Sequence, residues 1–96
     1  MASTVSYMLK TKQPVSDARL IAGVQYTIST VQHYVVRPTN ARNNPRVSQR
    51  LFEEACLVLD AAEERGLERM LQLNVLGRLR ILLETFQKQM HSQGLV

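Results

Sequence analysis

The sequence predicts an all-α fold, a small three-helix bundle with a flexible N-terminal arm. Apolar residues recur at three- and four-residue steps over three long stretches, which is the spacing of one helical face. Pro38, Pro45 and Gly66 separate these stretches, as expected of helix boundaries. The chain has 96 residues, so it forms one domain with a small core.

Residues 1–13 are expected to form the arm. Val5, Tyr7 and Leu9 alternate with other residues as in a strand, but the run is too short to be stable alone. No charged segment followed by an apolar run is present at the N-terminus, so a cytoplasmic location is the default expectation. At the other end, residues 92–96 are expected to fray.

The first helix is predicted at residues 16–36. Ser16 is a favourable N-cap, and Asp17 suits the positive end of the helix dipole. The apolar face spans an arc of about 100° and consists of Leu20, Ile21, Val24, Ile28, Val31 and Val35. Many residues here are β-branched, so tertiary burial must stabilise this helix. The Arg37-Pro38 step ends it.

The second helix is predicted at residues 45–65. Asn44 is the expected N-cap, Pro45 the first helical residue and Gly66 the residue that terminates the helix. The apolar stripe consists of Val47, Leu51, Ala55, Val58, Leu59 and Ala62. Leu57 lies apart from this stripe, so it is a candidate contact residue.

The third helix is predicted at residues 67–91. Leu71, Leu73, Val75 and Leu82 widen its central seam to an arc of about 200°, more than one neighbouring helix covers. A homodimer or higher oligomer through this helix is therefore expected, with Gly77 allowing another backbone to approach. The predicted interface, the apolar arc, consists of Leu57, Leu76, Leu79, Leu83, Phe86 and Met90.

The sequence contains no recognisable catalytic, cofactor or metal motif. Cys56 lies at the edge of an apolar stripe, where a packed thiol is more common than a nucleophile. His33 and His91 are far apart, and neither has an acidic residue one helical turn away. The glycines are isolated, so no phosphate-binding loop is expected. We expect a protein that is not an enzyme and needs no cofactor.

Charge is distributed unevenly along the chain. Residues 1–50 contain seven basic residues and one acidic residue, whereas residues 51–96 contain five basic and seven acidic residues. Four arginines form a basic loop without an acidic residue: Arg37, Arg42, Arg46 and Arg50. This loop favours an acidic partner.

The leading functional hypothesis is a protein–protein interaction module, a small adaptor, regulator or inhibitor that binds a partner with an acidic surface. The alternative is a regulatory protein that binds nucleic acid through the basic loop, since arginine and asparagine side chains contact phosphates. No aromatic residue interleaves with these arginines, so base stacking is not indicated. No apolar run is long enough to span a membrane.

Overall fold

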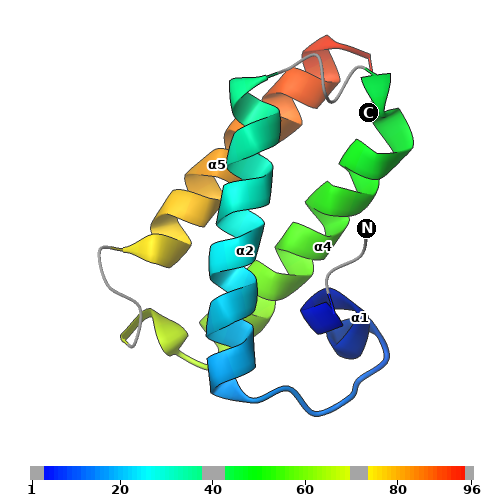
Figure 1. The fold of residues 1–96 in the computed structure, drawn as a ribbon. Coiled ribbons are helices and arrows are strands. Elements are labelled where there is room, and N and C mark those ends of the chain that lie inside the picture. Colours follow the sequence, from blue (N-terminus) through cyan, green and yellow to red (C-terminus); the bar gives the residue numbers. More distant parts are fainter. Residues whose placement is uncertain (1–3, 38–42, 70–73, 95–96) are drawn as a thin grey trace.

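The computed structural model describes residues 4–37, 43–69 and 74–94, and every regular element in these ranges is helical. The elements are α1 (Thr4–Lys10), α2 (Asp17–Val36), α4 (Pro45–Glu64), the short 3₁₀ helix η1 (Leu67–Arg69) and α5 (Val75–Ser92) (Figure 1). The prediction of an all-α fold is confirmed. In the described ranges, no helix combines the length and apolar character needed to cross a membrane.

Helices α2, α4 and α5 pack against one another pairwise, and α1 packs on α4 and α2. In Figure 1, α2 runs between α5 and α4, while α1 lies beside the C-terminal half of α4. The radius of gyration is 13.0 Å, close to the roughly 13 Å typical of a folded domain of about 100 residues. The chain is therefore compact.

The ends of α2 and α4 follow local chemistry. Ser16 adopts an extended backbone, and its side chain accepts a hydrogen bond from the Arg19 backbone N–H at 3.2 Å. Helix α4 has Pro45 in its first turn and is followed by Gly66 with a φ of 65°, in the left-handed region. The first and last residues of both helices are within one residue of those that the sequence predicts.

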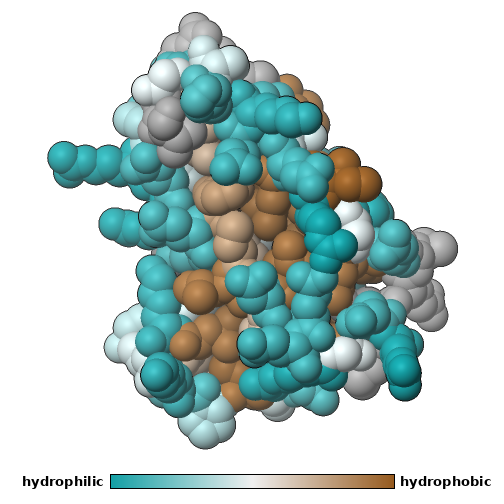
Figure 2. Space-filling view, turned by 180° about the vertical axis from the view of Figure 1, so that it is seen from behind, coloured by the Kyte–Doolittle hydropathy of each residue, from teal (hydrophilic) through white to brown (hydrophobic). Residues whose placement is uncertain are grey.

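The core lies where α2, α4 and α5 meet. Phe86 of α5 is fully buried, and its ring lies edge-on to Tyr34 of α2 and tilted to Phe52 of α4, with centroid distances of 5.9 and 6.3 Å. One aromatic side chain thus joins all three long helices. The face behind that of Figure 1 carries a band of apolar atoms between polar residues (Figure 2), so polar residues do not completely cover the helices.

The prediction of an arm is wrong for residues 4–10, because these residues form α1 and pack on the rest of the chain. Val5 lies against α2 at Gly23, where an added Cβ would be 3.1 Å from the Val5 Cγ1. Ser6 is fully buried, and the Met8 sulfur accepts a hydrogen bond from the Arg19 guanidinium at 3.5 Å. Seven residues make only about two helical turns, too few for the 3.6-residue period to be evident.

The prediction of one continuous helix over 67–91 is also wrong. Leu67–Arg69 is a 3₁₀ helix, and Asn74 has a φ of 52°, so α5 begins only at Val75. It continues to Ser92, so the first residue of the expected tail is helical. A Cβ at Gly77 would lie 2.5 Å from the Asn74 Nδ2, so the Asn74 side chain occupies the space beside this glycine.

Candidate functional site

The apolar arc predicted to be an interface is mostly the core of the chain itself. All five of its α5 residues are buried, namely Leu76, Leu79, Leu83, Phe86 and Met90. The sixth residue, Leu57, is half-buried on α4, and Leu71 and Leu73 lie outside the described residues. The arc is covered because α2 and α4 both pack on α5. The five α5 residues therefore do not face a partner in this conformation, and this prediction is corrected.

The described arginines of the basic loop are at the surface. Arg37, Arg46 and Arg50 are exposed, whereas Arg42 lies outside the described residues. The ion pairs within the described ranges are Arg65 with Asp17 and Arg80 with Glu63, so Arg37, Arg46 and Arg50 have no acidic partner there. Their guanidinium groups are available to an anionic group from outside the chain.

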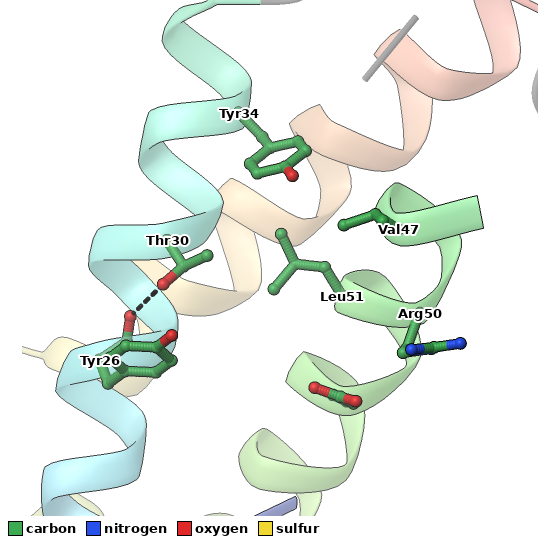
Figure 3. Close-up of a pocket in the computed structure, with 7 residues that line it drawn as sticks. Tyr26, Thr30, Tyr34, Val47, Arg50 and Leu51 are labelled. Carbon is green, nitrogen blue, oxygen red and sulfur yellow. Dashed lines mark hydrogen bonds between the residues drawn. The ribbon is translucent and has the colours of Figure 1, made fainter. Parts of the chain in front are cut away.

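A pocket lies between α2 and α4, beside Arg50. It is lined by Tyr26, Thr30 and Tyr34 of α2 and by Val47, Arg50, Leu51 and Glu54 of α4 (Figure 3), and we call it the α2–α4 groove. Its volume is about 110 Å³. Pockets for cofactors and drug-sized molecules measure roughly 300–1,000 Å³. The groove therefore fits one side chain better than a cofactor.

The walls of the α2–α4 groove are largely apolar and aromatic. Figure 3 shows Tyr34 on α2 and both Val47 and Leu51 on α4 directed toward the space between the helices. Tyr26 and Val47 are 54% and 42% exposed, so apolar surface remains in contact with solvent at the mouth. The Thr30 hydroxyl donates to the Tyr26 carbonyl at 2.9 Å within α2, which leaves the groove fewer polar groups.

Glu54 gives the α2–α4 groove a negative charge. Its residue is only 6% exposed, and no hydrogen bond or ion pair reaches it from the described residues. Arg50 precedes it by one helical turn, but Figure 3 shows the Arg50 side chain directed away from the space between the helices. Its carboxylate oxygens are not fully buried, so they keep contact with water in the groove, and a group that fills the groove must replace that water.

Sequence reasoning missed the residues that form this groove. Tyr26, Thr30 and Tyr34 follow one another at four-residue steps on the flank of the apolar face of α2. Glu54 lies three residues after Leu51 and four before Val58, which places it on the edge of the α4 stripe. That position is the one signal that marks Glu54, since an acidic residue next to buried positions needs an explanation.

The described residues offer little for catalysis or metal binding. No group of three or more His, Cys, Asp or Glu side chains in the described ranges is arranged to hold a metal ion. Cys56 is half-buried, and burial raises the pKa of its thiol, with the Asp60 and Glu53 carboxylates raising it further. A raised pKa disfavours the thiolate, which is the reactive form.

The comparisons with known proteins identify no relative of this chain. No family model, no curated protein and no solved structure matches it. The geometry of the chain is therefore the basis on which its function is inferred.

Proposed function

We propose that this protein is a non-enzymatic protein–protein interaction module, an adaptor, regulator or inhibitor that binds its partner through the α2–α4 groove. The observation that carries the proposal is the exposure of Tyr26 and Val47 at the mouth of a pocket. Arg46 and Arg50 lie beside it and have no acidic partner among the described residues. Aromatic residues and arginine are enriched where proteins contact one another, particularly around pockets that receive a partner side chain.

The proportions of the groove also favour a protein partner. A volume of about 110 Å³ is too small for a typical metabolite or cofactor, but the apolar surface continues outward over Tyr26 and Val47. The arginines beside it would contact acidic residues of the partner at the edge of the interface. Such charges increase the association rate and the specificity more than the affinity.

Site-specific photo-crosslinking tests this proposal. A photoreactive phenylalanine at Val47 should form covalent adducts with a discrete protein in the cells that make this chain. The matched control is Asp60, which is also exposed on α4 but does not line the groove. Adducts at position 47 should weaken when Arg46 and Arg50 are changed to Ala. Equal labelling from positions 47 and 60, or none from either, would remove the proposal.

Nucleic-acid binding is a second candidate, favoured by one observation. Arg37, Arg46 and Arg50 are exposed and have no acidic partner within the described residues, in a chain of net charge +4. Binding through these side chains should decline steeply with salt and fall uniformly across sequences in the Arg46→Ala, Arg50→Ala variant. Mobility-shift assays at low salt distinguish the candidates, because the protein-interaction module should not shift DNA or RNA.

A further inference from the structure

We propose that the α2–α4 groove receives a single lysine or arginine side chain of the partner protein, whose cationic group pairs with Glu54. This inference rests on the proposed function and specifies the chemistry of the same site. The segment of the partner that binds here would carry one basic residue that enters the groove. Acidic residues on either side of it would contact Arg46 and Arg50.

The carboxylate of Glu54 calls for a cation. Glu54 lines the groove, is 6% exposed and receives no hydrogen bond or ion pair from the described residues. A group that fills the groove takes the remaining water from this carboxylate, which is unfavourable unless an opposite charge or hydrogen-bond donors replace the water. A cationic group that enters the groove would supply both. Charge-assisted hydrogen bonds between carboxylates and ammonium or guanidinium groups are among the strong ones in proteins.

The walls of the groove suit the rest of such a side chain. Lysine and arginine carry their charge on an aliphatic stem that packs well on apolar surface. Val47, Leu51 and Tyr34 provide that surface, and the tyrosine rings can also attract a nearby cation through their faces. A volume of about 110 Å³ holds three or four water molecules at roughly 30 Å³ each, which is the scale of one long side chain.

The other charges around the groove define what flanks the entering residue. Arg50 lines the groove and Arg46 lies one turn earlier on α4, both exposed, whereas the α2 side contributes only tyrosine and threonine. Two arginines repel a uniformly basic segment. They attract a segment in which acidic residues surround one lysine or arginine, so charge complementarity selects that pattern.

The first test uses n-butylammonium, which reproduces the end of a lysine side chain, with binding followed by two-dimensional NMR at constant ionic strength. Shift changes should concentrate on Val47, Leu51 and Glu54. The Glu54→Gln variant should weaken binding about tenfold or more, because the cation loses its charged acceptor. The uncharged n-butanol should bind wild type and variant equally weakly. Arg50→Ala should strengthen butylammonium binding, since it removes a nearby positive charge.

Two variants keep the test independent of folding. Glu54→Gln should unfold at a temperature no lower than that of the wild type, because Glu54 makes no hydrogen bond or ion pair with the described residues that the change would remove. Leu51→Phe should block butylammonium binding by filling the groove while leaving Glu54 in place. Three outcomes would each overturn the assignment. They are shift changes outside the groove, equal butylammonium binding to wild type and Glu54→Gln, and a lower unfolding temperature for Glu54→Gln.

Crosslinking from position 47 then identifies the source of the side chain. The adduct with a partner protein should be lost in the Glu54→Gln background. Persistence of that adduct would overturn the cation assignment and leave the proposed function intact. Butylammonium binding without any adduct would overturn the proposed function and the assignment to a partner protein, while the pairing of a cation with Glu54 would stand. A third outcome is that the pure protein dimerises and that Glu54→Gln abolishes the dimer. The occupant of the groove would then be a second copy of this chain, which would overturn the assignment to a different protein.

Discussion

Cys56 shows how the surroundings of one residue determine its chemistry. The thiol is half-buried on α4, and its pKa is raised first by burial and then by the nearby carboxylates of Asp60 and Glu53. All three effects oppose formation of the thiolate. This environment agrees with the interpretation of Cys56 as a packed side chain, because reactive cysteines usually lie near positive charges.

We predict that Cys56 reacts with iodoacetamide several-fold more slowly in the folded protein than in the denatured chain at the same mildly alkaline pH. The thiolate is the nucleophile, and a raised pKa means that less of it is present until the pH rises further. The midpoint of the rate against pH should therefore lie at higher pH in the folded state. Asp60→Asn should move it back toward lower pH. A folded-state midpoint below that of the denatured chain would contradict burial and carboxylate repulsion as the dominant influences on this thiol.

At the scale of the helices, apolar periodicity predicted the bounds correctly where a helix was long and residues typical of helix boundaries marked its ends. Helix α2 has Ser16 at its start and the Arg37-Pro38 step after its end, and α4 begins at Pro45. Twenty residues give more than five turns, so the apolar face is unambiguous. The seven residues of α1 are too few to show such a face, so their sequence pattern resembled that of a strand.

The start of α5 was missed for a different reason. Asn74 adopts the left-handed conformation, which asparagine tolerates better than most residues but which no apolar pattern reveals. The leucines on both sides of Asn74 preserve the helical spacing in the sequence, although the helix itself begins one residue later. Periodicity reports which residues are buried and does not report whether the backbone between them is continuous.

The contact between α1 and α2 depends on Gly23, which leaves room for the Val5 side chain. A Cβ at position 23 would lie 3.1–3.2 Å from three atoms of the Val5 side chain, so Val5 must move by a few tenths of an ångström. Alanine in a helix interior is more stabilising than glycine by about 1 kcal/mol, which offsets the cost of moving Val5. We therefore expect Gly23→Ala to leave the global free energy of unfolding within about 1 kcal/mol of the wild type but to lower amide protection in α1.

A double-mutant cycle isolates that contact. Val5→Ala removes the atoms that a new Cβ would meet, so Gly23→Ala should be more favourable in the Val5→Ala background than in the wild type. The coupling energy should be about 0.5–1.5 kcal/mol, the range for residues in contact. Urea unfolding of the four proteins measures it. Strict additivity would show that Val5 does not contact Gly23 in solution.

At the scale of the whole molecule, the sequence indicated how much apolar surface α5 has but not what covers it. The arc was too wide for one neighbouring helix to cover. Two neighbours of the same chain, α2 and α4, cover its buried α5 residues, so those residues need no second copy to bury them. The α2–α4 groove was missed because it depends on how two helices face each other, which neither periodic pattern contains.

Leu79 tests whether α5 serves the core of a single chain. Its side chain is fully buried, so Leu79→Ala should lower the free energy of unfolding by about 2–5 kcal/mol. That is a large part of the roughly 5–15 kcal/mol available to a small domain. The matched control is Ile81→Ala on the same helix, which is 64% exposed and should change stability by no more than about 0.5 kcal/mol.

Urea unfolding followed by circular dichroism should give the same midpoints at low and high protein concentration. If the midpoint instead rises with concentration, and Leu79→Ala yields folded monomers from a wild-type dimer, then α5 faces a second copy and the single-chain core is not its main role.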